Sequence, residues 1–438
     1  MMSKRILVLG AGPAGGAVAI GLRRMGYPVT VVSEPRPFDA VEGISARAIE
    51  GLRGAGFQRA LERVASASPR QVTWNGQTSA ANTEHLVVRQ RFDAALLEDL
   101  SAEGITVIEG RVKRHRFLGE RHVIEVEADT EPAALECEFL VEARGRAAPA
   151  AGVPRVQGRK TLSLLQYWQG PVGPARSAVQ SFAEGWAWLA QCVDGRRYLQ
   201  LTVDADSTRL PPKQALGDWC RTRLEQLEQA QPFIEGAEPV GEVRARISTP
   251  VLCERIAGDN WIRVGDAAMA VDPLSGNGIF QALSSALQAP AVVNTLLQNP
   301  EQNGLACQFH EQRIEGLFYR FARIGRDFYA QESQWPDQAF WQKRSHWPDT
   351  TPLHSEVTPD KVTTDWRPVV QDGLITQVEV VITPDQPLGI WHLNGLELAP
   401  LLRRIRAQHR PVADVLGESL GAERGVQLAH WMLQQGWV

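Results

Sequence analysis

Short apolar strands alternate with amphipathic helices at the start of the chain. Residues 4–9 contain a nearly uninterrupted apolar run, which is typical of a strand buried on both faces of a parallel sheet. Apolar residues then recur at helical spacing over Ala14–Met25, and Gly26 follows as a stop signal. A further apolar run, Pro28–Ser33, predicts the next strand. Together these segments predict a β-α-β unit with parallel strands.

Elements of the same kinds recur later in the chain. Further buried strands are predicted at His85–Val88, Ile105–Glu109, Glu138–Ala143 and Trp261–Val264. Further helices are predicted at Arg91–Ala102, Gly278–Leu297 and residues 305–334. Two alternating runs, Val112–Phe117 and His122–Ala128, indicate a hairpin between them.

The pattern changes to a period of two between residues 160 and 250. Alternating runs at Thr161–Gln169, Val179–Ala183, Trp186–Cys192 and Arg197–Val203 predict strands, and a helix is expected at Lys213–Ala230. Such alternation is typical of an antiparallel sheet with one covered face, so we expect a separate layer.

The C-terminal part follows a Pro-, His- and Asp-rich linker at Pro348–Pro359. Its predicted elements are two strands and three short helices, at Leu374–Thr383, Gly389–Leu393, Leu401–Ile405, Val412–Leu420 and Gln427–Leu433. The chain is therefore expected to be an α/β protein with α+β elements in three domains. These are a discontinuous nucleotide-binding domain (1–160 plus 250–345), an antiparallel substrate domain (161–249) and a small C-terminal domain (350–438). A winged-helix-like form is one option for the C-terminal domain.

Composition narrows the class of protein. The chain has 438 residues, 44% of them hydrophobic and 22% charged, as in ordinary globular proteins. A net charge of −4 gives no electrostatic reason to expect nucleic acid or an anionic membrane as a partner. Five scattered cysteines without a C-x-x-C pair indicate reduced thiols rather than a disulfide framework or a metal site. No apolar stretch is long enough for a membrane span, and we expect a cytoplasmic protein.

The first motif with a chemical meaning is the glycine loop after the first strand. It reads Gly10-Ala11-Gly12-Pro13-Ala14-Gly15. In such a loop the first glycine permits the tight turn, the second lets the backbone approach a pyrophosphate, and the third lets the helix pack on the strand. The helix N-terminus then faces the negative charge. The surrounding β-α-β pattern makes this a predicted dinucleotide site.

An acidic residue at the end of the second strand would hydrogen-bond the ribose hydroxyls of the dinucleotide. The usual position holds Ser33, and Glu34 follows one place later. A carboxylate accepts from both hydroxyls, which favours Glu34, while the serine hydroxyl remains the alternative.

A second motif lies far along the chain, in Trp261-Ile-Arg-Val-Gly265-Asp266, then Pro273 and Gly276-Asn277-Gly278. It resembles a pattern of glutathione-reductase-type flavoproteins, the para-hydroxybenzoate hydroxylase and tryptophan halogenase families. The resemblance implies a Rossmann domain that binds FAD. Asp266 would then bond a ribityl hydroxyl, and Pro273 would lead into Gly276, Asn277 and Gly278, where the glycines after the proline would present backbone N–H groups to the flavin.

A third segment, Arg89-Gln-Arg-Phe92-Asp93, resembles the Arg-x-x-Phe-Asp segment of the same families. By that resemblance Arg89 would face the FAD phosphates. The stretch Val41-Glu42-Gly43-Ile44 stands where these relatives carry a Gly-Glu near the flavin. His85 and Glu42 are the candidate residues of the catalytic pocket, although a strand-end histidine is more commonly bound to the backbone.

The chemistry that the flavin would perform is narrowed by what the sequence lacks. It has no second glycine fingerprint for NAD(P)H and no redox cysteine pair, so electrons would come from a transient NAD(P)H or from a separate flavin reductase. The pair Trp186-Ala-Trp188 resembles the start of the halogenases' Trp-x-Trp-x-Ile-Pro, but Ala190 and Gln191 replace Ile-Pro. Residues 61–110 contain no lysine, and a halogenase needs one to hold its hypohalous species. Halogenation is therefore the weaker alternative.

The whole chain most resembles flavoprotein monooxygenases that mature tryptophan-derived quinone cofactors in bacterial enzymes. That resemblance implies hydroxylation of an aromatic ring with molecular oxygen through a flavin C4a-(hydro)peroxide. The substrate would be a tryptophan within a polypeptide, a quinoprotein subunit, which the C-terminal domain could dock. The alternatives are a small-molecule aromatic hydroxylase and a flavin-bearing scaffold without turnover.

Overall fold

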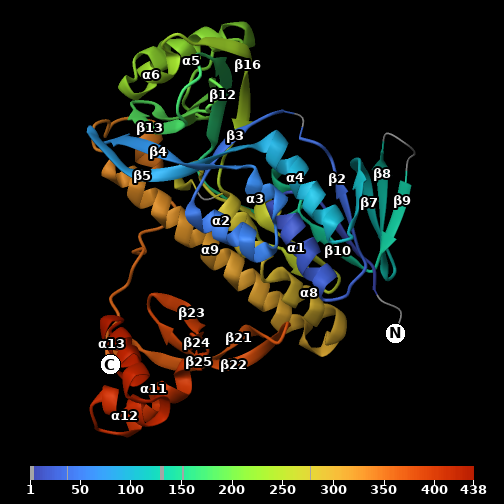
Figure 1. Ribbon diagram of the computed structural model, residues 1–438, viewed down its shortest axis with the longest axis vertical. Helices are drawn as coiled ribbons and strands as arrows, with labels where there is room; N and C mark the ends of the chain where they lie inside the picture. Colours follow the sequence, from blue (N-terminus) through green and yellow to red (C-terminus); the bar gives the residue numbers. More distant parts are fainter. Residues whose placement is uncertain (1–3, 37, 129–132, 150–151, 277) are drawn as a thin grey trace. The chain divides into compact units, whose positions relative to one another are not determined.

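The computed structural model describes residues 4–36, 38–128, 133–149, 152–276 and 278–438. The chain divides into two compact units (Figure 1). Unit 1 is Met1–Pro290 with Ile314–Thr350, and unit 2 is Ala291–Arg313 with Thr351–Val438. The three domain ranges expected from the sequence stay predictions, because compact packing alone does not show which parts fold independently.

A six-stranded sheet carries the predicted β-α-β unit in unit 1. Its order is β18-β19-β10-β1-β2-β6, and every pair is parallel except β18 with β19. The bounds are β1 Ile6–Leu9, β2 Val29–Ser33, β6 Thr106–Glu109, β10 Phe139–Glu142, β18 Ala257–Gly258 and β19 Trp261–Arg263. The parallel strands therefore end at one common edge, where α/β sheets bind their ligands.

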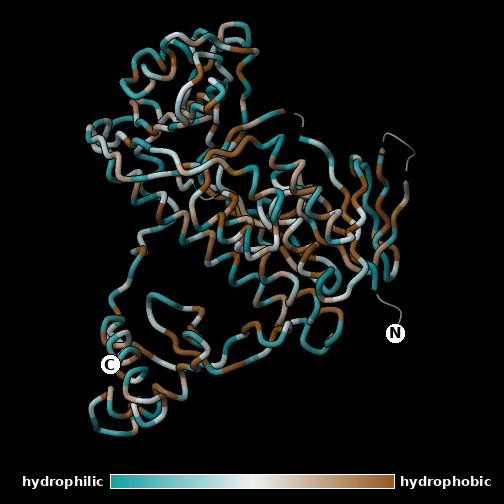
Figure 2. The backbone as a smooth tube through the Cα atoms, viewed as in Figure 1, coloured by the Kyte–Doolittle hydropathy of each residue, from teal (hydrophilic) through white to brown (hydrophobic). Residues whose placement is uncertain are grey.

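Both faces of this sheet are covered, as the apolar strand composition predicted. Leu7 and Leu9 of β1 pack against Ile124 and Val126 of a small sheet on one face. The small sheet consists of β7 Arg111–Leu118, β8 Arg121–Glu127 and β9 Ala133–Cys137. On the helical side lie α1 Pro13–Arg24, α2 Ala46–Ala55, α3 Arg59–Glu62 and α4 Arg89–Ala102. Figure 2 shows hydrophobic stretches running through this interior.

An eight-stranded sheet forms the other large layer of unit 1. Its order is β16-β12-β15-β14-β13-β4-β5-β3, with only β13 and β4 parallel. The bounds are β3 Val41–Ile44, β4 Val64–Trp74, β5 Gln77–Val88, β12 Thr161–Gln169, β13 Arg176–Phe182, β14 Gly185–Gln191, β15 Arg196–Asp204 and β16 Glu238–Ile247. The antiparallel strands predicted between residues 160 and 250 are confirmed. The expectation of a separate layer is incomplete, because β3, β4 and β5 from residues 41–88 extend the same sheet.

The two faces of this sheet differ in composition. One face packs its apolar side chains on α5 Leu216–Glu225 and α6 Gln231–Ile234, the helical pieces that replace the single helix expected at Lys213–Ala230. The opposite face carries aromatic and charged side chains, among them Trp186, Trp188 and Tyr198. That second face is the one from which side chains reach the residues of the predicted flavin motif.

The remaining helices differ in one respect from the sequence pattern. The helix expected at Gly278–Leu297 is interrupted, and it forms α7 Gly278–Ala286 and α8 Ala289–Gln298. Pro290 lacks a backbone N–H, so an uninterrupted helix would lose a hydrogen bond there. Beyond these lie α9 Asn303–Gln331 and α10 Ala339–Arg344, and a small sheet joins β11 Arg155–Gln157, β17 Val251–Cys253 and β20 Met269–Ala270.

Unit 2 contains the predicted C-terminal elements and two strands that the pattern missed, β21 Thr363–Gln371 and β25 Leu396–Glu397. Strands β21, β22 Leu374–Thr383 and β23 Gln386–Ile390 form one sheet, and β24 His392–Leu393 pairs with β25. Helices α11 Leu398–Ala407, α12 Val412–Leu420 and α13 Ala422–Gln434 enclose an apolar core. Among the described residues of both units, we find no helix of sufficient length and apolarity for a bilayer.

Candidate FAD site

The glycine loop turns sharply between β1 and α1. Gly10 adopts φ +104°, and a Cβ there would lie 2.4 Å from the carbonyl oxygen of Ala143. A Cβ on Gly15 would lie 1.9 Å from the Gly10 oxygen, so helix and strand approach too closely for any side chain. Gly12 is different, because nothing lies within 4 Å of its Cβ position. Two glycines are thus required by the protein's own packing, and one faces open space.

Pro13 and Ala14 begin α1 directly behind this loop, with Pro13 in the first turn, where its missing N–H loses no bond. The second motif lies against them. Gly265 adopts φ +58°, and a Cβ there would lie 2.7 Å from Cβ of Ala14. Its N–H donates to Oγ of Ser285 on α7 over 2.8 Å. The structure therefore brings together two motifs that lie far apart in the sequence.

Asp266 follows in a short 3-10 turn, and its carboxylate lies 3.6 Å from Nε of Arg146. Its side chain remains 38% exposed, yet burial by the surrounding protein raises its pKa, with the attraction of Arg146 opposing the shift. Glu42, Arg89 and Arg36 also act on it electrostatically.

The flavin-facing turn expected after Asp266 is built around Asp272. This carboxylate caps the turn Pro273–Ser275 by accepting from the N–H of Leu274 over 2.9 Å. Gly276 follows with φ +59°, and Gly278 begins α7 with nothing within 4 Å of its Cβ position. Asn277, named with them in the sequence motif, lies outside the described residues.

Arg89 is the first residue of α4, so that helix begins before the position expected from periodicity. Its guanidinium is buried and donates to Glu42 Oε1 over 2.7 Å and to Asp93 Oδ1 over 2.7 and 3.0 Å. Burial lowers the pKa of Arg89, but the two carboxylates outweigh it and raise the pKa above its usual range. Arg89 and Glu42 thus form one ion-paired group beside Asp266, in which the charge of Arg89 is already matched.

The two candidates for ribose binding lie at the end of β2. Ser33 is the last residue of the strand and is paired in register with Glu109 of β6. Glu34 is exposed, and its carboxylate lies 4.0 Å from Nε of Arg111. The choice between the two remains a prediction.

His85 lies on β5, opposite Ile44 and Ala67 in the sheet. Its Nδ1 is 2.8 Å from the carbonyl oxygen of Ala65. This backbone contact is the one that a strand-end histidine commonly makes. A role for His85 in the pocket stays a prediction.

Sequence reasoning missed a charged pair on the aromatic face of the eight-stranded sheet. Glu84 is buried on β5, and its Oε2 lies 3.6 Å from Nη1 of Arg70 on β4. A Cβ on Gly43 would lie 2.1 Å from the same oxygen, and one on Gly276 would lie 3.6 Å from Arg70 Nη1. The pair therefore lies between the two segments expected to flank the flavin. The sequence carried no signal for this pair, because residues 77–84 are small or polar and mostly exposed.

The described residues fit a bound FAD. The space at Gly12 and Gly278 is open where backbone N–H groups would meet the dinucleotide. Within the described part of the chain, Arg70 Nε and both amide atoms of Gln281 are buried without a hydrogen-bond partner. Buried polar atoms are rarely left unpaired in native proteins, so a missing ligand or water accounts for them.

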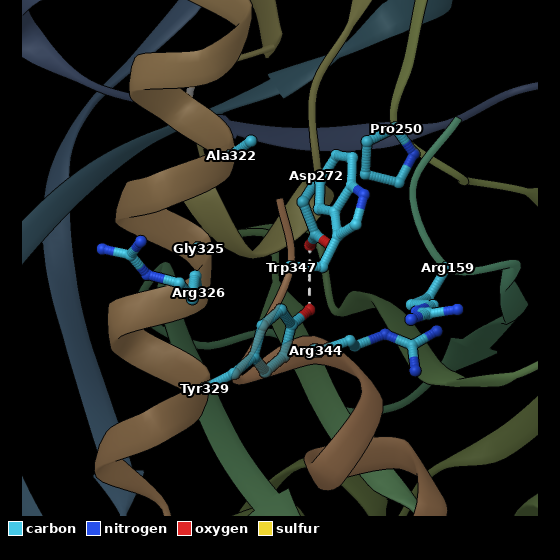
Figure 3. A pocket seen from close by; sticks show the side chains of 9 residues that line it. All are labelled: Arg159, Pro250, Asp272, Ala322, Gly325, Arg326, Tyr329, Arg344 and Trp347. Atoms are coloured by element: carbon cyan, nitrogen blue, oxygen red, sulfur yellow. Dashed lines mark hydrogen bonds between the residues drawn. The ribbon is translucent and has the colours of Figure 1, made fainter. Parts of the chain in front are cut away.

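A small cavity adjoins this region, lined by residues that include Asp272, Tyr329 and Arg344 (Figure 3). Its volume of about 10 Å³ admits roughly one water molecule, not an aromatic substrate. The phenol of Tyr329 donates to Asp272 Oδ1 over 2.9 Å beside it. The cavity is therefore not a substrate site, and the residues around it stabilise the turn that Asp272 caps.

Comparison with protein families shows which cofactor the protein binds. A model of the FAD binding domain family matches residues 4–315. The chain belongs to this family. FAD is therefore its cofactor, and the protein is a flavin-dependent oxidoreductase, as the two glycine motifs predicted.

Two flavin-related proteins are similar to most of the chain. Tryptophan 2-halogenase of Chondromyces crocatus is 28% identical over 372 residues, which cover 77% of this chain and 70% of the halogenase. The putative FAD-dependent oxidoreductase LodB of Marinomonas mediterranea is 23% identical over 367 residues, covering 78% and 97%.

Among solved structures, the peptidyl tryptophan dihydroxylase QhpG, essential for tryptophylquinone cofactor biogenesis, is 51% identical to this chain. The match covers 100% of both chains with a TM-score of 0.88. The flavin-dependent halogenase CmlS is 20% identical and covers 100% of this chain and 96% of its own, with a TM-score of 0.79. At that identity the likeness to CmlS shows a shared fold alone. These matches confirm the expected α/β fold with a Rossmann-type FAD domain.

Proposed function

We propose that this chain is an FAD-dependent monooxygenase that hydroxylates a tryptophan side chain within a polypeptide during the biogenesis of a tryptophan-derived quinone cofactor. The observation that carries the proposal is the similarity to peptidyl tryptophan dihydroxylase QhpG, which extends over both whole chains at 51% identity. Unit 2 is included in that match, whereas the family model ends at residue 315.

The site supports oxygenation better than halogenation. The segment 61–110, in which the halogenase-like pattern would carry its lysine, forms β4, β5 and α4 and contains none. The cations of this segment that the structure pairs with carboxylates are arginines, among them Arg70 with the buried Glu84 and Arg89 with Asp93. An arginine does not lose its proton at ordinary pH, so it would not serve as the nucleophilic amine that holds a hypohalous species.

The proposed roles of individual residues follow from their positions. The loop residues Gly10, Gly12, Pro13, Ala14 and Gly15 would hold the pyrophosphate of FAD at the start of α1. Bound FAD would supply the two-electron chemistry that activates molecular oxygen.

The second motif would hold the other end of the cofactor. Asp266 would accept from a ribityl hydroxyl, and the turn from Pro273 to Gly278 would present backbone N–H groups to the ring. Arg89 would hold Glu42 at the edge of the flavin pocket rather than bind phosphate itself, because two carboxylates already occupy its guanidinium. Glu42 and His85 remain the candidate pocket residues.

The proposed co-substrates are molecular oxygen and a polypeptide, with electrons from NAD(P)H or from a separate flavin reductase. The test uses the full-length protein loaded with FAD, a reductant and a quinoprotein subunit before its cofactor has formed. We expect oxygen uptake to rise when that polypeptide is added, and mass spectrometry to find added oxygen on one tryptophan. The matched control is the same polypeptide with that tryptophan replaced by phenylalanine.

Other outcomes would favour the alternatives. Faster oxygen uptake with free tryptophan or phenols would favour a small-molecule hydroxylase. A product with chlorine or bromine isotopes in the presence of halide would favour a halogenase. Absence of oxygen uptake under every condition, with FAD bound, would favour a binding scaffold.

A further inference from the structure

Both tryptophans of the central strand β14 donate their indole N–H to side chains that are linked through further contacts to the turn at Pro273–Gly276, which is expected to face the flavin. Trp186 Nε1 donates to the phenol oxygen of Tyr329 over 3.3 Å, and the phenol donates onward to Asp272 Oδ1 over 2.9 Å. The same Asp272 oxygen caps the turn through the N–H of Leu274. This first chain therefore links strand β14, helix α9 and the turn Pro273–Ser275. Figure 3 shows its middle bond, from Tyr329 to Asp272.

The second chain starts two residues further along the same face of β14. Trp188 Nε1 donates to Glu84 Oε1 over 3.2 Å. The other oxygen of Glu84 lies 3.6 Å from Arg70 Nη1. A Cβ built on Gly276 would lie 3.6 Å from the same nitrogen, so the guanidinium of Arg70 lies beside the backbone of Gly276 without a hydrogen bond to it. The second chain thus ends in close approach to the residue that follows the first chain's turn.

Neighbouring indoles provide a contrast within the same aromatic cluster. Trp341 packs in one cluster with Trp186 and Tyr329, but its N–H donates to the backbone oxygens of Phe182 and Ala183. Trp74 donates to the backbone oxygen of Phe328. These indoles satisfy their N–H groups on the backbone, whereas Trp186 and Trp188 are bonded to a phenol and a carboxylate.

We propose that Trp186 and Trp188 are positioning residues for FAD, which hold the turn Pro273–Gly276 through Tyr329–Asp272 and through Glu84–Arg70. Packing alone would be served by phenylalanine, which has no donor to satisfy. A buried carboxylate is stable only when it is hydrogen-bonded or paired. Trp188 supplies such a bond to Glu84 directly, and Trp186 orients the phenol that donates to Asp272. The two carboxylates act on adjacent parts of one turn. The inference rests on FAD binding and not on the identity of the substrate.

The test compares Trp186→Phe and Trp188→Phe with the control Trp341→Phe, in the full chain. Each substitution keeps an aromatic ring and removes one indole N–H, but only the first two interrupt a chain to the turn. We measure the dissociation constant of FAD by titrating the FAD-free protein, and the visible spectrum of bound FAD. Loss of one hydrogen bond corresponds to about a two- to tenfold change in a binding constant. We expect that weakening, with a shifted flavin spectrum, in Trp186→Phe and Trp188→Phe and not in Trp341→Phe.

A second variant distinguishes the effect of the hydrogen-bond chain from a general loss of packing. Tyr329→Phe removes only the phenol oxygen that joins Trp186 to Asp272. If the chain acts as a unit, adding Trp186→Phe to Tyr329→Phe changes FAD affinity little further, whereas adding Trp188→Phe weakens it again. If Trp186→Phe folds poorly, Tyr329→Phe alone still interrupts the first chain and should weaken FAD binding.

The proposal is overturned if Trp186→Phe and Trp188→Phe bind FAD with the affinity and spectrum of Trp341→Phe. Equal loss of affinity in all three variants overturns it as well, because the effect would then be packing. Neither result bears on hydroxylation. Failure of the polypeptide assay with these results intact would count against the proposed function alone.

Discussion

The glycine loop gives the sharpest test of the FAD site, because two of its glycines respond differently to the same methyl group. Gly12→Ala places the new Cβ where nothing lies within 4 Å, and φ at this residue is −67°, which alanine adopts freely. The FAD-free protein should therefore keep its melting temperature. The added methyl group fills the space through which the backbone would meet the pyrophosphate.

The expected loss of FAD affinity follows from that overlap. Forcing one methyl group into an occupied space costs about 1–3 kcal/mol, which weakens binding by roughly five- to a hundredfold. Gly10→Ala is the matched opposite. Its Cβ would meet the Ala143 oxygen at 2.4 Å with φ at +104°, so clash and strain together should cost about 2–6 kcal/mol of folding free energy.

The assay combines thermal unfolding of both FAD-free variants with FAD titration followed by flavin fluorescence. Gly12→Ala should unfold like the unchanged protein and bind FAD weakly, while Gly10→Ala should unfold at a lower temperature. Unchanged FAD affinity in Gly12→Ala would refute the assignment of this loop to the pyrophosphate. A large loss of stability in that variant would refute the reasoning from open space.

Three further predictions concern charged residues. Asp266→Ala should release FAD, because it removes the carboxylate that would accept from a ribityl hydroxyl. The protein should stay folded, because the ion pair that is lost, with Arg146, is long at 3.6 Å. Flavin absorbance that is retained after gel filtration would contradict this prediction. Asp204, whose side chain is 1% exposed, has a pKa lowered to about 2: burial opposes the shift, and bonds from Ser207 and Arg344 outweigh it. The ionised Asp204 carboxylate stabilises the folded state above its ordinary pKa, and this stabilisation should be lost as the pH falls towards 2. The free energy of unfolding should then decrease by about 2 kcal/mol. In Asp204→Asn, denaturant unfolding should depend less on pH in this range. Arg89→Met should cost about 2–3 kcal/mol by the same measurement, since it removes the cation that pairs with Glu42 and leaves Asp93 with Arg36 alone; a smaller cost in Arg89→Met than in Arg89→Lys would contradict the ion-pair argument.

The sequence predicted best the parts of the fold that depend on local geometry. Gly10, Gly15 and Gly265 are positions where a backbone conformation or a close approach admits no side chain, so residue type and role coincide. The strands of the parallel sheet were recognisable because both faces are buried. The helix break near Leu287–Gln288 was missed because the apolar pattern continues through Pro290.

The sequence predicted poorly whatever depends on sheet register. Residues 64–84 alternate small and polar side chains with few apolar ones, since much of β4 and β5 is exposed, and the pattern did not indicate strands. Glu84 meets Arg70 and Trp188 only because β5, β4, β13 and β14 are neighbours in that order. No spacing along the chain contains that information. The Trp186–Tyr329–Asp272 chain likewise joins three distant segments.

The ion pair between Arg89 and Glu42 lies where the two large sheets of unit 1 share one chain segment. Glu42 belongs to β3, the edge strand of the eight-stranded sheet, and Arg89 begins α4 directly after β5, which is its partner in that sheet. Helix α4 then leads into β6 of the parallel sheet. The ion pair between Arg89 and Glu42 fixes the direction in which the chain passes from the eight-stranded sheet to the parallel sheet. We therefore interpret Arg89 as the residue that fixes the eight-stranded sheet relative to the parallel sheet. This role explains why protein carboxylates pair with its guanidinium.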